Sequence, residues 1–211
     1  MFDWMIGSVS GFSFVVSPFF LAVFLYLAWI TRRLLKRDVK AAPMGYVLLG
    51  SAMITLVVLL GHELSHALTA AFLGLPVTEI GLTFFGAYTE IPGMGEAPAL
   101  AALLVGLAGS FFNLATVRPL ILVSRRIRNE LLSRTVWIVA YVSAFIGLLN
   151  LIPTRFLDGG KVILAVWRLV GIDPAGRLAD VVDTAALFIL FYFIITGPPK
   201  FLWKFIRRFT S

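Results

Sequence analysis

The residues best suited to chemistry lie in HELSH, residues 62–66, which contains the only two histidines of the 211-residue chain. If this segment is helical, His62 and His66 lie four positions apart and share one face. Two imidazoles in that arrangement can bind one zinc ion with bonds of about 2.0–2.1 Å. Glu63, turned about 100° around the helix, can reach a zinc-bound water without ligating the metal. The pattern is the HExxH arrangement of hydrolytic zinc sites, and it predicts His62 and His66 as ligands and Glu63 as the general base.

The surroundings of this motif strengthen the prediction. HELSH lies near the end of an apolar run over residues 44–73, which Gly74 and Pro76 terminate. A charged side chain inside a membrane-spanning helix costs about 2.5 kcal/mol or more, so ionisable residues at such positions usually have a function. The alternative is that the three side chains pair with one another, or form a polar helix end at the membrane interface.

A catalytic zinc commonly takes three protein ligands and leaves one position open. The chain has no cysteine and no third histidine, so the third charged ligand must be an aspartate or a glutamate. We favour Asp158, which follows an apolar run in the irregular stretch PTRFLDGGK, because irregular backbone at membrane depth must be buried in protein or line a cavity. Asp180 and Asp183 are the alternative, although both also suit the first turn of a helix. Glutamates of a predicted hairpin and its exit are further candidates: Glu79, Glu90 and Glu96.

The composition indicates a membrane protein. Hydrophobic residues make up 60% of the chain and charged residues 14%, against about 45–50% and about 25% in soluble domains. We therefore expect one membrane-embedded domain over residues 1–211 with a catalytic core of about 44–170. The expected fold is all-α, with five to six transmembrane helices and a short β-hairpin within 77–91, after the HExxH helix. The expected spans are residues 12–30, 44–73, 99–123, 135–152 and 178–196, with a short amphipathic helix near 162–170.

The basic residues also point to membrane flanks rather than to nucleic acid. The net charge is +7, and Lys and Arg cluster beside the apolar runs, as they do in cytoplasmic loops. Segments 31–40, 124–134 and 197–211 hold thirteen of the 18 Lys and Arg residues. With five spans these segments share one side, which the positive-inside rule makes cytoplasmic. That orientation would direct the HELSH end of its helix to the outside.

Together with HELSH, the downstream sequence NLIPTRFLDGG resembles the site-2 protease family of intramembrane metalloproteases. The family element Asn-x-x-Pro-x-x-x-Leu-Asp-Gly is matched here by residues 150–159. The resemblance implies that Asp158 is the third zinc ligand and that Glu63 is first a base and then a proton donor. It implies a zinc site nearer the cytosol, opposite to the charge count. Asn150 would contact the substrate backbone or the developing oxyanion, or else cap the helix before Pro153.

Two weaker similarities complete the resemblance. GSFFN, residues 109–113, is similar to a family element ending in Asn, but Ser110 and Phe111 stand where Gly-Pro is frequent. FFGAYTEIP is similar to the family's hairpin, with Gly86–Ala87 in place of a Gly-Gly pair. Phe85 and Gly86 would then contribute to substrate binding, since an extended substrate can add to the hairpin as a strand. The alternative is an ordinary surface hairpin.

These observations predict a multi-pass protein of the cell membrane that holds one Zn²⁺ per chain and hydrolyses peptide bonds of membrane-spanning protein substrates. A non-catalytic metal-binding membrane protein is the alternative from a different class, but it would not need Glu63. A membrane protease of another HExxH type, with glutamate as third ligand, is a further alternative. The sequence predicts contact with the lipid bilayer and makes no prediction of oligomeric state.

Overall fold

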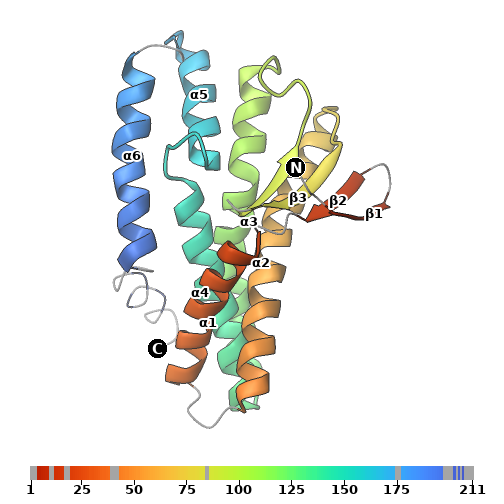
Figure 1. The fold of residues 1–211 in the computed structure, drawn as a ribbon, viewed down its shortest axis with the longest axis vertical. Helices are drawn as coiled ribbons and strands as arrows, with labels where there is room; N and C mark the ends of the chain where they lie inside the picture. The colour runs from red at the N-terminus through yellow and green to blue at the C-terminus, as the bar shows by residue number, and fades with distance from the viewer. Residues whose placement is uncertain are drawn as a thin grey trace.

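A computed structural model describes residues 4–9, 12–16, 20–38, 43–83, 86–173 and 177–196, together with residues 202, 204 and 206. The described residues form a bundle of helices with a small sheet against one side (Figure 1). The helices are α1 (Phe20–Asp38), α2 (Met44–Phe72), α3 (Ala99–Arg126), α4 (Glu130–Asn150), α5 (Asp158–Val170) and α6 (Arg177–Thr196).

Three helices within the described ranges, α2, α3 and α4, are long and apolar enough to cross a membrane. They match three of the predicted spans, and α4 begins five residues earlier than predicted. Helices α1 and α6 correspond to the first and last predicted spans, and α5 corresponds to the short amphipathic helix. The total of five to six transmembrane helices stays a prediction.

The predicted hairpin is confirmed as β3 (Glu79–Thr83) and β4 (Gly86–Glu90), which pair antiparallel. Two further strands, β1 (Trp4–Val9) and β2 (Phe12–Val16), extend it to a sheet in the order β1-β2-β3-β4, with β2 and β3 parallel. The expectation of a mainly helical fold with one hairpin is confirmed, but β1 and β2 were not predicted, and the prediction that a helix begins at Phe12 is wrong. The segment FSFVV consists largely of aromatic and β-branched residues, which favour strands when a partner strand is present. Here β1 and β3 supply those partners.

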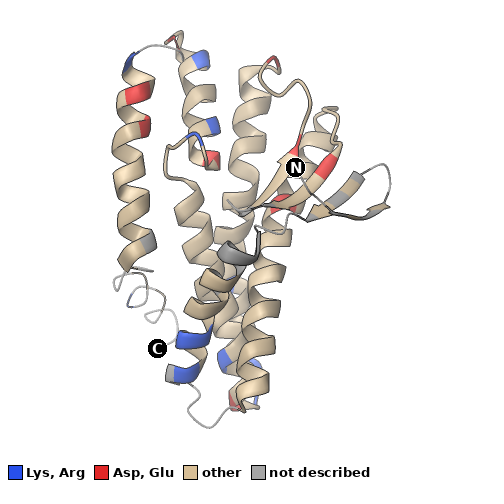
Figure 2. Ribbon diagram, viewed as in Figure 1, with Lys and Arg blue, Asp and Glu red and all other residues tan. Residues whose placement is uncertain are grey.

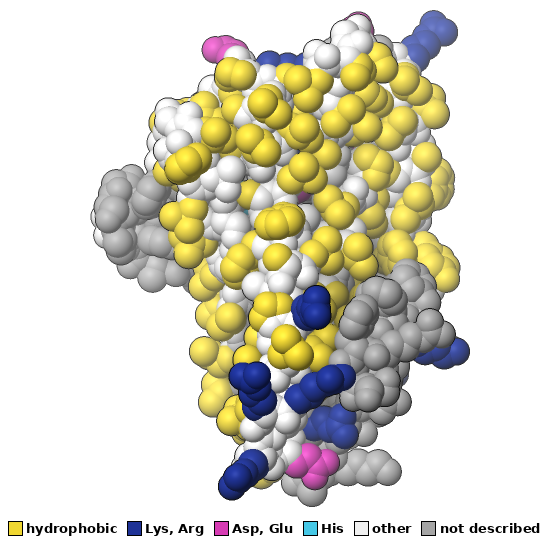
Figure 3. Space-filling model, turned by 180° about the vertical axis from the view of Figure 1, so that it is seen from behind, with side chains coloured by type: hydrophobic (Ala, Val, Ile, Leu, Met, Phe, Trp, Pro, Cys, Tyr) yellow, Lys and Arg dark blue, Asp and Glu magenta, His cyan; other side chains and the backbone are white. Residues whose placement is uncertain are grey.

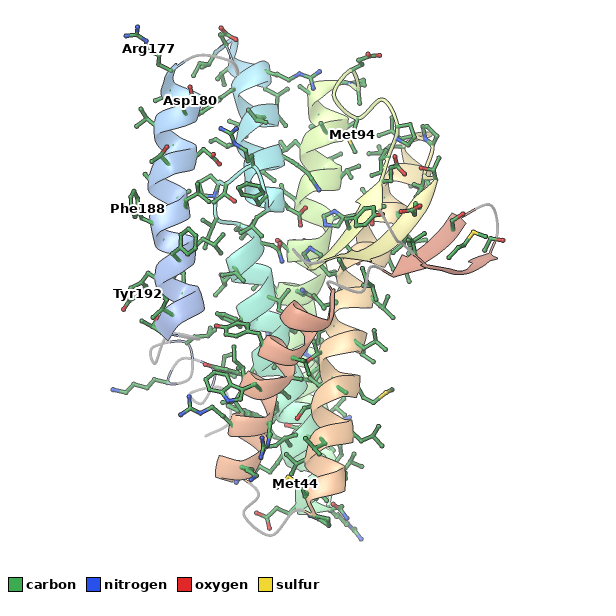
Figure 4. All side chains as sticks on the ribbon, in the orientation of Figure 1. Met44, Met94, Arg177, Asp180, Phe188 and Tyr192 are labelled. Carbon is green, nitrogen blue, oxygen red and sulfur yellow. The ribbon has the colours of Figure 1, made fainter. Side chains whose placement is uncertain are left out.

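The core of the bundle lies where α1, α2, α3 and α4 meet, with Ile54, Ile121 and Ile138 among its buried residues. Apolar side chains also cover a broad band of the outer surface, whereas Lys and Arg gather at one end (Figure 3). On α6, Phe188 and Tyr192 are 74% and 61% exposed and point away from the other helices (Figure 4). An outward-facing apolar surface of this kind suits lipid rather than water.

The charged residues divide between the two ends of the bundle (Figure 2). One end carries the basic residues at the end of α1 and around the α3–α4 connection, including Arg32, Arg33, Arg125 and Arg126. Helix α2 begins at this end and carries HELSH towards the opposite end, beside the sheet. The charge count therefore still places the HELSH end of α2 towards the outside, whereas the family resemblance implies a zinc site nearer the cytosol. The two expectations for membrane orientation still disagree.

Candidate metal centre

Helix α2 buries the HELSH motif within the protein. His62, Glu63 and His66 are 2%, 5% and 3% exposed, although all three are polar. The helix continues to Phe72 and ends in a Schellman motif, in which Gly74 has φ = 74° and the Leu75 N–H donates to the Ala70 carbonyl oxygen. A glycine suits this position because a Cβ disfavours positive φ. HELSH therefore lies about two to three helical turns inside a well-terminated helix.

Asp158 is brought to the same place by the start of α5, of which it is the first residue. A Cβ on Gly159 would collide with the carbonyl oxygens of Leu151 and Ile152, and one on Gly160 with the carbonyl oxygen of Thr154. The glycine pair thus lets the turn after α4 cross closely over the first turn of α5. This close crossing holds the Asp158 side chain inside the protein.

Three donor atoms form a compact triangle at this point. Asp158 Oδ2 lies 2.8 Å from His62 Nε2 and 2.9 Å from His66 Nε2, and the two Nε2 atoms are 3.2 Å apart. Donors of a tetrahedral zinc with bonds of about 2.0–2.1 Å are separated by about 3.3 Å. Two imidazoles and one carboxylate also make up a donor set known for catalytic zinc. The geometry and the chemistry of these residues therefore fit a zinc ion.

Glu63 lies close to this triangle without being part of it. His62, Glu63 and His66 each offer an atom within 4.8 Å of the others, so these three also form a group able to hold a metal ion. Asp158 Oδ2 is nearer to both imidazole nitrogens, and Glu63 Oε2 instead accepts a hydrogen bond of 2.9 Å from the hydroxyl of Thr89 on β4. The shorter distances favour Asp158 over Glu63 as the third ligand and leave Glu63 beside the metal position.

The other ring nitrogen of His66 fixes the orientation of that imidazole. His66 Nδ1 lies 2.6 Å from the main-chain carbonyl oxygen of Val105 on α3. A carbonyl oxygen only accepts, so Nδ1 carries the proton and donates. The tautomer leaves Nε2 unprotonated and directed at Asp158 and His62, as metal coordination requires.

His62 has an equivalent partner that was not predicted from the sequence. The amide nitrogen of Asn113, a fully buried side chain on α3, lies 3.1 Å from His62 Nδ1. With zinc on Nε2, Nδ1 must donate, and a 180° rotation of the Asn113 amide presents its oxygen as the acceptor. The rotated amide nitrogen would then donate to Ser143 Oγ, 3.3 Å from the present Oδ1, while Ser143 Oγ donates to the Asn113 carbonyl oxygen. The sequence feature that could have pointed to this partner is the Asn at the end of GSFFN.

Gly109 lets α3 approach both histidines. A Cβ at this position would lie 2.5 Å from His66 Nε2 and 2.6 Å from His62 Nε2. Because glycine has no Cβ, residue 109 leaves room for the donor triangle. That Gly109 would face the histidine rings was not predicted from the sequence.

The alternative third ligands lie elsewhere. Asp183 pairs with Arg155, with 2.7 Å between Oδ2 and Nε, and Asp180 is 3.6 Å from the same guanidinium. Figure 4 places Asp180 near the start of α6, at the outer end of the molecule. In the hairpin, Glu79 accepts a hydrogen bond from the Tyr88 hydroxyl, and Glu90 accepts one from Thr78. The preference for Asp158 over these residues therefore agrees with the geometry.

The predicted substrate-binding residues are not part of the triangle. Asn150 is half-buried, and its amide nitrogen donates to the carbonyl oxygen of Ile146, one turn earlier in α4. Gly86 is the first residue of β4 and pairs with Thr83. Phe85 lies outside the described residues.

A cavity of about 430 Å³ opens beside the triangle. His66 and Thr89 lie in its wall together with residues of the 91–95 loop, α3 and α5. Lys161 also lines this cavity, and its ammonium group donates to Asp158 Oδ1 at 3.0 Å, so the outer carboxylate oxygen is satisfied. The site thus has free space on the side of His66 and Thr89.

Comparison with known proteins gives one family match and curated relatives. Residues 119–193 match peptidase family M50. "Putative zinc metalloprotease Rip3" of Mycobacterium tuberculosis is 32% identical over 193 residues, covering 84% of this chain and 49% of that protein. "Putative zinc metalloprotease sll0528" of Synechocystis is 28% identical over 180 residues, covering 82% of this chain and 46% of that protein. The chain thus spans about half the length of these curated relatives.

A solved structure shares the fold. The site-2 protease from Methanocaldococcus jannaschii superposes with a TM-score of 0.64 at 18% identity, covering 100% of this chain and 96% of that one. The family match includes the Asn150–Gly159 element that follows α4, and the curated relatives extend the similarity over most of the chain. These matches relate the chain to peptidase family M50 and to the site-2 protease fold.

Proposed function

We propose that this protein is an intramembrane zinc metalloprotease that hydrolyses peptide bonds in or near the transmembrane segments of its substrates. The observation that carries the proposal is the buried triangle of His62 Nε2, His66 Nε2 and Asp158 Oδ2, with no side longer than 3.2 Å. These three residues are the proposed ligands of one zinc ion per chain. Because apolar helices surround them, the reaction would take place within the membrane.

The proposed chemistry divides between the metal and one carboxylate. When bound, zinc supplies Lewis-acid polarisation of the scissile carbonyl and makes water a better nucleophile. Glu63 accepts the proton of that water and passes it to the leaving amine. The carboxylate suits this role because it is buried beside the triangle and its Oε1 is free of the Thr89 contact made by Oε2. A non-catalytic metal-binding protein, the alternative, would not need an acid at this position.

The hairpin is the proposed substrate-binding element. Among the described strands, β4 is the outer strand of the sheet and packs beside α2, so its outer edge lies close to the site. A locally unwound substrate can add to such an edge as a strand, with main-chain hydrogen bonds holding it. Gly86 at the start of β4 and Asn150 at the end of α4 are proposed to contact it, as is Phe85, which lies outside the described residues. To contact the substrate, Asn150 must break the hydrogen bond from its amide nitrogen to the Ile146 carbonyl oxygen.

The proposed setting is a multi-pass protein of the cell membrane, organised as a single domain over residues 1–211 with a catalytic core of about 44–170. Its partners would be the lipid bilayer and membrane-spanning protein substrates. The exposed apolar side chains of α2 and α6 support this setting, because they would otherwise face water.

The test is cleavage of a purified single-span protein in detergent by the wild type and by Glu63→Gln. Mass spectrometry of the fragments locates the cleaved bond. We expect one cut within or beside the spanning segment for the wild type, and none for Glu63→Gln with its zinc retained. Equal cleavage by both proteins would refute the role of Glu63, and zinc binding without cleavage of any membrane-spanning substrate would favour the binding protein.

A further inference from the structure

We infer that Thr89 is a positioning residue for the general base, an inference that rests on the proposed function. Thr89 lies on β4, 26 residues from Glu63 in sequence. Its hydroxyl oxygen is 2.9 Å from Glu63 Oε2 and 3.0 Å from the Glu63 main-chain carbonyl oxygen. Both atoms are acceptors, so the hydroxyl is the donor in each contact. One hydroxyl therefore ties the strand proposed to bind substrate to the residue proposed to move the proton.

The strand geometry explains why Thr89 faces the site. Alternate side chains of a strand point to opposite faces, so Ala87 and Thr89 share one face, while Tyr88 and Glu90 share the other. Ala87 packs against the core of the bundle. The Tyr88 hydroxyl instead bonds to Glu79 within the hairpin. Thr89 is thus the hydroxyl residue of β4 that is directed at α2.

Burial makes this hydrogen bond important for the base. Glu63 is 5% exposed, and a buried carboxylate without a donor is strongly disfavoured. The Thr89 hydroxyl satisfies Oε2 and so fixes the rotation of the carboxylate. Oε1 does not share this contact and is the oxygen proposed to take up a proton. Removal of the hydroxyl would let the carboxylate rotate while leaving the three proposed ligands untouched.

The test compares steady-state kinetics of Thr89→Val, Thr89→Ser, Thr78→Val and Glu63→Gln with those of the wild type, on one membrane-spanning substrate in detergent. Valine keeps the shape of threonine and removes the hydroxyl, whereas serine keeps the hydroxyl. Thr78→Val is the matched control, because Thr78 lies at the base of the same hairpin and its exposed hydroxyl contacts Glu90 rather than Glu63. Zinc content is measured on every variant.

We expect Thr89→Val to lower kcat at least about tenfold, since a hydrogen bond to a charged group is worth a factor of about ten to a hundred. KM and zinc content should stay near the wild-type values, Thr89→Ser should restore kcat, and Thr78→Val should behave as the wild type. A raised KM with unchanged kcat would overturn the inference, because Thr89 would then only hold the hairpin. Loss of zinc in Thr89→Val, or no recovery in Thr89→Ser, would overturn it as well.

The controls separate this inference from the proposed function. If the wild type cleaves, Glu63→Gln does not, and Thr89→Val has the kcat of Thr78→Val, the Thr89 inference alone fails. If Glu63→Gln cleaves as well as the wild type, the proposed function is refuted, and the Thr89 inference, which rests on it, is refuted too.

Discussion

Substitution of Gly109 by alanine should remove the metal from the site. The added methyl carbon would lie 2.5 Å from His66 Nε2 and 2.6 Å from His62 Nε2, whereas ordinary contacts begin at 3.4 Å. The methyl group therefore needs about 0.9 Å more room, and zinc–ligand distances tolerate only about 0.2 Å. Either α3 moves away or the imidazoles do, and each movement separates the donor atoms. The helix itself would gain, because alanine is favoured over glycine by about 1 kcal/mol in a helix interior.

The assay is zinc content per chain together with the thermal midpoint of the detergent-solubilised protein. We expect zinc to fall well below one per chain and cleavage to fall about a hundredfold or more, with helix content unchanged. Gly50→Ala on α2 is the matched control, since its nearest contacts would be 3.7 and 3.9 Å, and it should retain full zinc. Full zinc and wild-type cleavage in Gly109→Ala would refute the close approach of α3 to the two histidines.

Three further predictions follow from the contacts around the site. Asn113→Ala should weaken zinc binding about 10–100-fold by removing the partner of His62 Nδ1, as measured by competition with a chelator, and unchanged affinity would rule out that role. Asp183→Asn should keep full zinc and lose no more than about 1 kcal/mol of stability in denaturant unfolding, because its partner Arg155 is largely exposed; loss of zinc would restore Asp183 as a ligand candidate. Gly159→Ala should lower zinc content by forcing the start of α5 away from the turn after α4, and full zinc content would contradict that crossing.

The parts of the site that follow from local geometry could be predicted from the sequence. The histidines at i and i+4 share a helix face wherever that helix lies, so the pair needed no tertiary information. Asp158 was favoured because irregular backbone at membrane depth must be buried in protein or line a cavity. The spans over α2, α3 and α4 were predicted because long apolar runs leave few alternatives in a membrane.

The remaining features depend on contacts between distant segments. The segment Phe12–Val16 was predicted as helix because it begins an apolar run, residues 12–30, that is long enough to span a membrane. Its pairing with β3, more than sixty residues later, decides the matter. The contacts of Asn113 with His62 and of Thr89 with Glu63 span 51 and 26 residues and depend on which side chains face the site. A single sequence does not encode those directions in any local pattern.

The most direct test of the proposed zinc site is X-ray absorption at the zinc edge of the purified wild type and of Asp158→Ala, with zinc content measured on both. We predict one zinc per chain in the wild type, bound by two imidazole nitrogens and a carboxylate oxygen at about 2.0–2.1 Å. Asp158→Ala should bind zinc weakly and lose the carboxylate contribution from the spectrum. An Asp158→Ala protein with one tightly bound zinc and an unchanged spectrum would contradict the site described here.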